Sequence, residues 1–282
     1  VSHIDAAYEY RMRREGEAEV DFALRMANLL EEEIQRLGTE TVMAFVAEPV
    51  VGASLGTQPA PSGYFKRVRE ICDTYGVLFI ADEVMCGMGR TGSLFALEQE
   101  GIAADITTLA KGLGAGYQPI AAVMAAENVI CTIKDGSGTL WNGHTYMSHA
   151  IATAGALAVQ QVIEEENLLS NVRRRGEHLR KGLQTRLGQN PHVGDIRGRG
   201  LFCTAELVQD RATKQPFDAT LGLAPKIQKT ALDLGLMCYP SQGCADGTQG
   251  DHVLLAPAYT STLEEIETIC DLITQAIETA LS

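Results

Sequence analysis

The chain has 282 residues, of which 45% are hydrophobic and 21% are charged. This balance is typical of a globular protein with one large core or two smaller ones, and it excludes a disordered chain. The net charge of −13 at pH 7 argues against a nucleic-acid partner, because such binding needs a concentrated basic face. No stretch reaches the roughly 18 apolar residues of a membrane helix, and the first residues lack the apolar core of a signal peptide. Neither a membrane partner nor export is therefore expected.

Apolar runs bounded by turn residues alternate with amphipathic stretches in the first half of the chain. The runs cover residues 41–46, 77–81, 106–110 and 120–125. They predict buried parallel strands. Between the first two runs, the pattern predicts a helix that is capped by Ser62 and ended by Gly76. A unit of strand, helix and strand indicates an α/β fold with a mostly parallel central sheet flanked by helices.

The second half of the chain has a different pattern. Two long helices are predicted first, one from residue 148 and one over residues 168–187. A strand pair with glycine-rich bends follows over residues 192–208. The remaining predicted elements are a helix at 225–234, strands at 236–239 and 252–255, and a final helix at 261–281. We therefore expect a large domain over residues 1–165 and a smaller α+β C-terminal domain over residues 166–282.

Seven cysteines are distributed along the chain without a CxxC pair. They are Cys72, Cys86, Cys131, Cys203, Cys238, Cys244 and Cys270. An odd number of cysteines in apolar surroundings is typical of reduced thiols rather than of a disulfide framework. The pattern predicts a cytoplasmic protein without a metal site.

Two adjacent acids, Asp82 and Glu83, end the run at residues 77–81. At the carboxyl ends of parallel strands, such groups face the ligand crevice of an open α/β sheet. Because side chains alternate along a strand, only one of the two acids can share the ligand face. A helix cap or a surface position is the alternative role for these acids.

A single lysine, Lys111, follows the next strand pattern and enters a glycine-rich turn in the segment TLAKGLGAG. Glycines let other groups approach the amine closely, and a desolvated amine loses its charge and becomes a nucleophile. The alternative is a lysine that reaches solvent from a strand end. An acid and a lysine at successive strand ends are the pair that pyridoxal 5'-phosphate (PLP) requires. The acid keeps the ring nitrogen protonated, and the lysine binds the aldehyde.

Four segments resemble class III aminotransferases of PLP fold type I, in the same order and at similar separations. They are VAEPVVG, LFIADEVMCGMGRTG, TLAKGLGAGYQPIAAVM and NGHTYMSH. The resemblance extends from about Thr41 to the C-terminus and includes RGRGLF and LLAPA. It implies that the domain over residues 1–165 binds PLP.

The resemblance also implies roles for five residues. Lys111 would form the Schiff base and Asp82 would pair with the pyridine nitrogen, which makes these two the catalytic residues. Val84 would pack on one face of the ring, and Glu48 would be a further cofactor-binding residue. Thr145 would bind the phosphate across the subunit interface of a homodimer with a shared active site. From the residues alone, the turn at Thr145 either offers a hydroxyl and backbone donors to an anion or is a plain turn.

The chain departs from the family pattern in two places. Full-length members carry a further N-terminal portion with a Gly/Ser phosphate-binding turn and an aromatic that stacks on the cofactor, and neither is found here. A separate N-terminal segment or chain is therefore an expected partner. Ornithine- and GABA-type members have EPxxGE, whereas Ala53 stands in the position of the second acid here. That difference favours the ω-amino acid:pyruvate branch of the aspartate aminotransferase family.

We therefore expect a PLP-dependent aminotransferase that moves an amino group from an ω-amino acid or amine to an oxo acid such as pyruvate. The alternatives are another class III PLP activity, such as that of a racemase, aminomutase or decarboxylase, or a non-catalytic fragment of the fold. These alternatives share the sequence features described above.

Two groups of arginines have more than one interpretation. Arg197 and Arg199, in IRGRG, either clamp a substrate carboxylate or pack the turn of the small domain. The cluster at 173–175, with Arg180 and Lys181, lies in a helical pattern that is rich in glutamate and predicts a solvated face.

Overall fold

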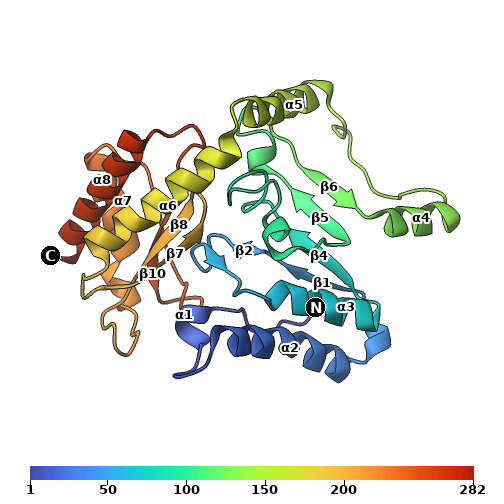
Figure 1. Cartoon of the computed structure of the whole chain (residues 1–282), viewed down its shortest axis with the longest axis horizontal. Helices are drawn as coiled ribbons and strands as arrows, with labels where there is room; N and C mark the ends of the chain where they lie inside the picture. The colour runs from blue at the N-terminus through green and yellow to red at the C-terminus, as the bar shows by residue number, and fades with distance from the viewer.

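The computed structural model describes all 282 residues and contains two four-stranded sheets with helices around them (Figure 1). The α-helices are α1 (Glu9–Met12), α2 (Glu19–Leu37), α3 (Tyr64–Tyr75), α4 (Glu127–Asp135), α5 (Ala150–Glu165), α6 (Leu168–Leu187), α7 (Leu223–Asp233) and α8 (Leu263–Leu281). Four 3-10 helices are η1 (Thr39–Thr41), η2 (Ala96–Glu100), η3 (Lys111–Leu113) and η4 (Ala219–Leu221). None of the helices combines the length and the apolar character that crossing a bilayer requires.

The strands fall into three sheets. They are β1 (Ala44–Ala47), β2 (Val50–Val51), β3 (Gln58–Pro59), β4 (Leu78–Asp82), β5 (Ile106–Leu109), β6 (Ala122–Ala125), β7 (Val193–Arg199), β8 (Phe202–Leu207), β9 (Tyr239–Gln242) and β10 (Asp251–Leu255). The first sheet has the order β1-β4-β5-β6, and β4 runs parallel to both β1 and β5. The second has the order β7-β8-β10-β9 and is antiparallel, and β2 pairs with β3 in a short ribbon. The predicted α/β class, with a mostly parallel sheet flanked by helices, is confirmed.

One strand of the first sheet differs from the prediction. The run at 120–125 was expected as a buried parallel strand, but β6 pairs antiparallel with β5, and Ala122 lies opposite Leu109. Val123 and Met124 are 70% and 50% exposed. The reason lies in the connection: residues 110–121 contain only η3 and turns, whereas a parallel return usually crosses the sheet through an α-helix.

Helix α3 lies where the sequence predicted a helix, but its N-terminus is different. Gly63, at φ +88°, occupies the capping position, and no side chain caps the helix. Ser62, the expected cap, instead donates its backbone amide to the Glu19 carboxylate at 3.4 Å. The helix ends at Gly76, as predicted, because φ +65° lets the chain turn there at little steric cost.

The core of the first sheet depends on a helix that the sequence did not predict. Phe22, Met26 and Ile34 of α2 are buried in one cluster with Phe65 of α3 and Phe79 of β4. Spaced at helical intervals, these α2 side chains form an apolar stripe that faces the core. In this half of the molecule, α2 and α3 therefore form a helical layer that packs on the first sheet.

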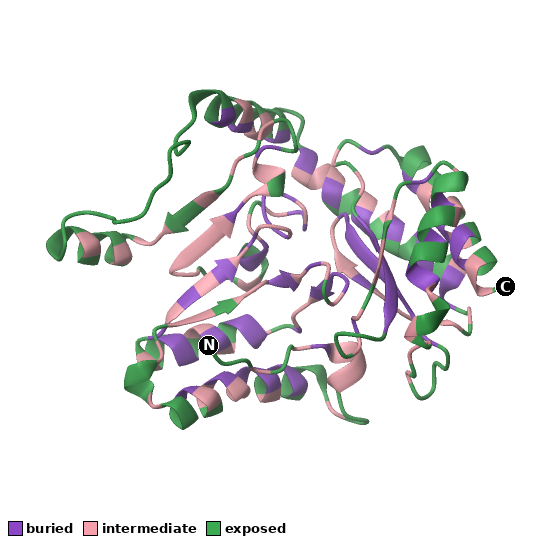
Figure 2. Cartoon of the chain, turned by 180° about the vertical axis from the view of Figure 1, so that it is seen from behind, coloured by how far each residue is buried: buried purple, intermediate pink, exposed green.

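The second sheet packs against α6, α7 and α8. The strand pair expected at 192–208 is the hairpin β7–β8, and the two inner strands β8 and β10 are buried along their whole length (Figure 2). The cluster beneath them draws only on residues between Val172 and Ile277, while the cluster of the first sheet draws on residues between Phe22 and Leu97. On this basis we propose that the chain divides near residue 165 into a large domain (1–165) and a small domain (166–282).

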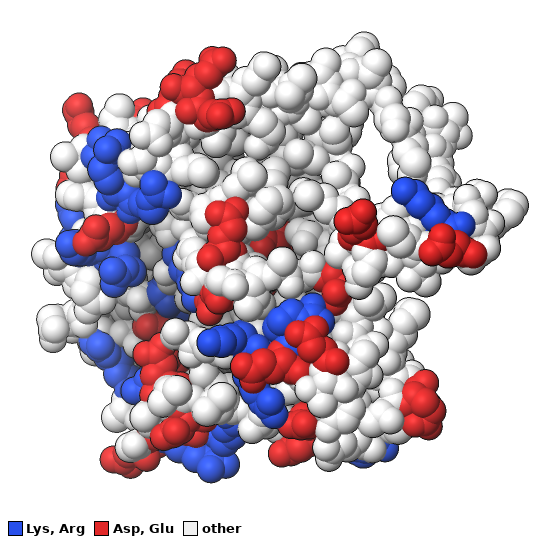
Figure 3. Space-filling model, turned by 45° about the vertical axis from the view of Figure 1, so that its right-hand side comes forward, with Lys and Arg blue, Asp and Glu red and all other residues white.

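Charged side chains of both signs are interspersed on the surface. Figure 3 shows Lys and Arg side by side with Asp and Glu on one face of the molecule. Arg186, for example, pairs with Glu267 at 2.5 Å and with Asp271 at 2.8 Å. Exposed pairs of this kind contribute about 0–1 kcal/mol each, so the core dominates the stability of this half.

A buried ionic network joins the N-terminal segment to the second sheet. The Arg197 side chain is only 7% exposed and donates to Glu206 Oε2 at 2.5 Å and to the Gly56 carbonyl at 2.8 Å. Tyr8 donates its hydroxyl to Glu206, and Arg11 donates to the same carboxylate. Burial opposes the charge on Glu206, but Arg197 and the other partners outweigh it and hold the pKa of this carboxyl below its usual range.

His252 of β10 lies beside this network and is fully buried. Burial, followed by the charge of Arg197, lowers the pKa of His252 from 6.5 to about 4. The imidazole is therefore neutral in the folded chain at neutral pH.

The depressed pKa of His252 makes stability depend on pH. Between pH 6.5 and about 4 the unfolded chain binds a proton at His252 that the folded chain does not bind, so stability is lost as the pH falls through this window. We expect this residue to account for a loss of about 3 kcal/mol across the window, at roughly 1.4 kcal/mol per pKa unit. Urea denaturation from pH 7 to pH 4 measures it, with His252→Gln reducing the slope and the exposed control His3→Gln retaining it. Equal slopes in the two variants would contradict the prediction.

Candidate active site

The candidate site lies at the carboxyl ends of the parallel strands. Asp82 is the last residue of β4 and is paired in register with Thr108 of β5. Its Oδ1 accepts hydrogen bonds from the Thr108 hydroxyl and from the Val84 amide, both at 3.1 Å. No hydrogen bond of the chain reaches Oδ2 of this half-buried side chain. The carboxylate is thus fixed through one oxygen, and the other is open to a ligand.

Glu83, the adjacent acid, has a structural role on the opposite side of the strand. It is 1% exposed, and its two oxygens accept hydrogen bonds from the Ala96 amide at 2.6 Å and the Leu97 amide at 3.0 Å. Burial raises the pKa of Glu83, although these two backbone donors oppose the shift. The expected alternation is confirmed: Glu83 satisfies the first amides of η2, while Asp82 faces the neighbouring strand.

Lys111 begins η3, two positions after β5 ends, in a strained backbone conformation. Its φ of +41° lies in the left-handed region, which a residue other than glycine adopts rarely and most often at functional sites. Its amine forms no ion pair in the chain and is exposed. The following Gly112 allows close packing, since a Cβ there would lie 3.0 Å from Met88 Cβ and 3.3 Å from the Tyr259 hydroxyl. The turn therefore holds the lysine against the loop that follows β4.

Glu48 supplies a third charged side chain, from just beyond the end of β1. Its Oε2 accepts a hydrogen bond from the Gly52 amide at 2.9 Å. Burial raises the pKa of Glu48, and the charge of Asp82 raises it further, while Gly52 and Lys111 act in the opposite direction. Glu48, Asp82 and Lys111 therefore share one electrostatic environment at the ends of three neighbouring strands.

Thr145 lies on a segment that is separate from this group. Residues 134–151 are all exposed, and Thr145 is one of them. The segment runs from α4 to α5 beyond the first sheet (Figure 1). Within one chain, the structure brings together Glu48, Asp82, Val84 and Lys111 but not Thr145.

The two arginines of IRGRG are both occupied by contacts within the chain. Arg197 is held by Glu206 and by the carbonyls of Leu55 and Gly56, as described for the buried network. Arg199 donates to the Ala60 carbonyl at 3.1 Å and to Glu100 at 2.9 Å. The contacts of both arginines therefore fit a packing role and not a clamp on a substrate carboxylate.

Thr108 is a residue of the site that the sequence analysis missed. Its hydroxyl fixes the orientation of Asp82, and only the strand register places it there. The signal available in the sequence was a pair of threonines, Thr107 and Thr108, in an otherwise apolar run. Without the register, nothing distinguishes the threonine that faces Asp82 from its neighbour.

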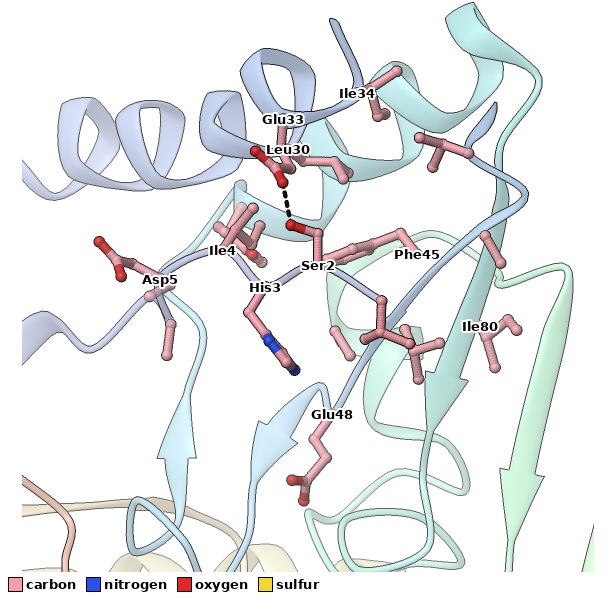
Figure 4. A pocket seen from close by; sticks show the side chains of 18 of the residues that line it. Ser2, His3, Ile4, Asp5, Leu30, Glu33, Ile34, Phe45, Glu48 and Ile80 are labelled. Carbon is pink, nitrogen blue, oxygen red and sulfur yellow. Dashed lines mark hydrogen bonds between the residues drawn. The ribbon is translucent and has the colours of Figure 1, made fainter. Parts of the chain in front are cut away.

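An apolar cavity lies next to the candidate site and not over it. It has a volume of about 980 Å³ and is lined by the N-terminal segment, α2 and β1, mostly with apolar side chains such as Leu30, Ile34 and Phe45 (Figure 4). Glu48 is part of its lining, whereas Asp82 and Lys111 are not. Figure 4 shows the Glu48 carboxylate directed away from Leu30 and Ile34. The apolar cavity and the charged group thus meet only at Glu48.

Comparison with known proteins places this arrangement in a family. A family model for aminotransferase class-III matches residues 1–277. An aminotransferase of Gibberella zeae is 46% identical over 282 residues, which are 100% of this chain and 55% of that protein. An aminotransferase of Schizosaccharomyces pombe is 41% identical over 281 residues, which are 100% of this chain and 61% of that protein.

Solved structures agree with the sequence comparison. An ω-transaminase of Pseudomonas jessenii, in complex with PMP, superposes with a TM-score of 0.90 at 36% identity, over 99% of this chain and 60% of that one. The chain belongs to the class III aminotransferase family and has the fold of PLP-dependent transaminases. It spans 55% and 61% of the length of the two relatives named above.

The different roles of the two acids predict different effects on stability. In Glu83→Gln, one of the two buried amides would face an NH2 group instead of an acceptor, so we expect a loss of about 1–3 kcal/mol. Asp82→Asn retains an oxygen for the Val84 amide and is half-exposed, so we expect a loss below about 1 kcal/mol. Urea denaturation of the two variants measures the difference. A larger loss for Asp82→Asn would reverse the assignment.

Proposed function

We propose that the chain carries the catalytic residues of a PLP-dependent aminotransferase that moves an amino group from an ω-amino acid or amine to an oxo acid such as pyruvate. The observation that supports it best is the group formed by Asp82, with one free carboxylate oxygen, and Lys111, with a free amine on a strained backbone. Both belong to a chain of the class III aminotransferase family.

The side chains present fit PLP as the cofactor. Asp82 Oδ2 is free to accept a hydrogen bond from a protonated ring nitrogen, and the Lys111 amine is free to bond to an aldehyde. Val84, two residues after Asp82, would pack on the ring, and Glu48 would add a further carboxyl group near it. When bound, PLP supplies an aldehyde that joins to amines and a ring that accepts electrons.

Each residue then has a definite task. Asp82 would hold the proton on the ring nitrogen, because a carboxylate favours the protonated form of a neighbouring base. Thr108 and the Val84 amide position Asp82 for this contact. Lys111 would hold the cofactor through its aldehyde, and its amine would act as the base that moves the proton at the substrate carbon.

The substrate class is supported by two features. Ala53 stands where the ornithine- and GABA-type pattern has an acid, so a partner for a switching arginine is missing at that position. The similar Pseudomonas jessenii protein is an ω-transaminase. Alanine formation that depends on pyruvate distinguishes aminotransfer from racemase, aminomutase or decarboxylase activity.

The central test is the identity of the lysine that binds the cofactor. After incubation with PLP and reduction with borohydride, we expect the label on Lys111, and we expect Lys111→Ala to abolish both the label and turnover. The matched control is Lys66→Ala, because Lys66 is also exposed but lies on α3. Peptide mapping reads out the result, and labelling of Lys66, Lys134 or any other lysine in place of Lys111 would refute the proposal.

We also propose that the working unit is a homodimer in which Thr145 binds the cofactor phosphate held by the other subunit. The exposed position of Thr145 supports it, as does the exposure of nearby Trp141 (88%) and Tyr146 (77%), since large apolar patches on a surface often mark interfaces. Two-fold pairing is also the commonest form of oligomer.

A mixed dimer tests the shared site. When a Thr145→Ala chain is paired with a Lys111→Ala chain, a cross-subunit role places both defects in one site and leaves the other intact, so we expect about half of the wild-type activity per dimer. The Thr145→Ala homodimer is the control, and it should retain the cofactor more weakly, by about 1–3 kcal/mol for a charge-assisted hydrogen bond. If the mixed dimer is no more active than this control, Thr145 serves its own chain.

The proposed location is the cytoplasm. All seven cysteines are free thiols, and Cys72, Cys86, Cys203, Cys244 and Cys270 are buried. Burial raises the pKa of Cys72 and Cys270 to about 11, which keeps these thiols protonated and unreactive. A reducing compartment maintains such thiols.

A further inference from the structure

A second pocket, polar and separate from the Asp82–Lys111 group, lies where the two halves of the chain meet. Its volume is about 310 Å³, and its walls come from α6, from the hairpin β7–β8 and from the loop that follows β4. Only one lining residue is hydrophobic. The side chains that face it include three arginines: Arg173, Arg180 and Arg199.

The floor of this pocket is formed by backbone that no side chain covers. A Cβ at Gly176 of α6 would lie 2.1 Å from the Gly200 carbonyl oxygen, and one at Gly198 would lie 2.0 Å from the Phe202 carbonyl oxygen. Atoms cannot approach so closely, so both positions require glycine. The glycines of RGRG thus bring the hairpin against α6 and leave a space bounded by polar groups.

Two of the three guanidinium groups have no carboxylate partner. Arg180 forms no ion pair and no hydrogen bond in the chain, and Arg173 donates only to the Gly92 carbonyl. Arg199 is paired with Glu100 at 2.9 Å, and the one acid among the lining residues, Glu177, is paired with Lys181 at 2.6 Å. The pocket therefore carries an excess of positive charge in a protein whose net charge is −13.

Thr91 adds an observation that is independent of charge. It is 4% exposed and lines the pocket, yet its hydroxyl has no hydrogen-bond partner. Gln99 donates to the Thr91 carbonyl at 3.1 Å and so fixes the loop that presents the hydroxyl. Buried polar atoms are rarely left unpaired in native proteins, and an unpaired one calls for a partner such as a bound ligand.

We infer that this pocket binds a phosphate group, carried by inorganic phosphate or by a small phosphate monoester. Thr91 offers an unpaired hydroxyl, and Arg173 and Arg180 offer guanidinium groups without a carboxylate partner. Guanidinium matches the pairs of oxygens that phosphate offers. The volume is at the lower end of the range for small-molecule sites. The site is independent of the proposed aminotransfer, since it contains neither Asp82 nor Lys111.

Calorimetric titration of the chain tests the inference. Inorganic phosphate and glycerol phosphate serve as the two probes, and acetate at equal ionic strength is the comparison for a monovalent carboxylate. We expect Arg180→Gln to weaken phosphate binding at least about tenfold, because it removes a charge-assisted contact. Thr91→Val should weaken phosphate binding about threefold or more, whereas Thr91→Ser, which keeps the hydroxyl, should bind phosphate as tightly as the unsubstituted chain. The matched control is Arg174→Gln, an exposed arginine on the same helix outside the pocket.

Several results would overturn the site. They are the absence of phosphate binding at millimolar concentration, acetate binding as tightly as phosphate, and an equal loss in Arg174→Gln and Arg180→Gln. Loss of phosphate binding in Thr145→Ala, with Arg180→Gln unaffected, would assign the phosphate to the proposed cofactor site instead. Tighter binding of glycerol phosphate than of phosphate identifies a monoester as the ligand, and the reverse order identifies the free anion. Because the titration contains no PLP, its outcome is distinct from that of the Lys111 labelling.

Discussion

The parallel register of β4 and β5 is the constraint on which the candidate site depends. It places Thr108 opposite Asp82, so that the hydroxyl of one strand orients the carboxylate of the other. The same pairing brings the end of β5 to the end of β4, and Lys111 follows within two residues. A shift of one residue would turn Thr108 to the other face of the sheet and leave Asp82 without this partner. The geometry of the site is therefore a property of the sheet, with the loops adding the lysine turn.

The two adjacent acids show how environment divides roles between identical groups. Asp82 and Glu83 are neighbours in sequence, but the alternation of the strand sends them to opposite sides. Two backbone amides take both oxygens of Glu83, whereas Asp82 keeps one oxygen free. The acid that is fully satisfied stabilises the fold, and the acid that is partly satisfied is available for chemistry. Glu48 resembles Asp82 in this respect, and its pKa is raised by burial and by the charge of Asp82.

Much of the fold was predictable because its signals are local. The strands that end at Asp82 and before Lys111, the helix α6 and the hairpin β7–β8 follow from apolar runs and glycines in the sequence. The direction of β6 was not predictable from its composition, since an apolar run has the same pattern in parallel and antiparallel pairs. Thr108 and Thr91 also escaped notice, because their roles depend on partners far away in sequence. Burial of Arg197 follows from three-dimensional contacts of the same kind.

The contact between Tyr8 and Glu206 spans 198 positions of the chain. During synthesis, the N-terminal residues leave the ribosome long before their carboxylate partner exists, at a rate of roughly 5–20 residues per second. Tyr8 and Arg11 must therefore wait for tens of seconds at the slower rate, while the helices and strands nearest to them form first. The second sheet, in turn, cannot bury Glu206 until the beginning of the chain returns to it. The half of the molecule that contains the second sheet is thus completed only after most of the chain has been synthesised.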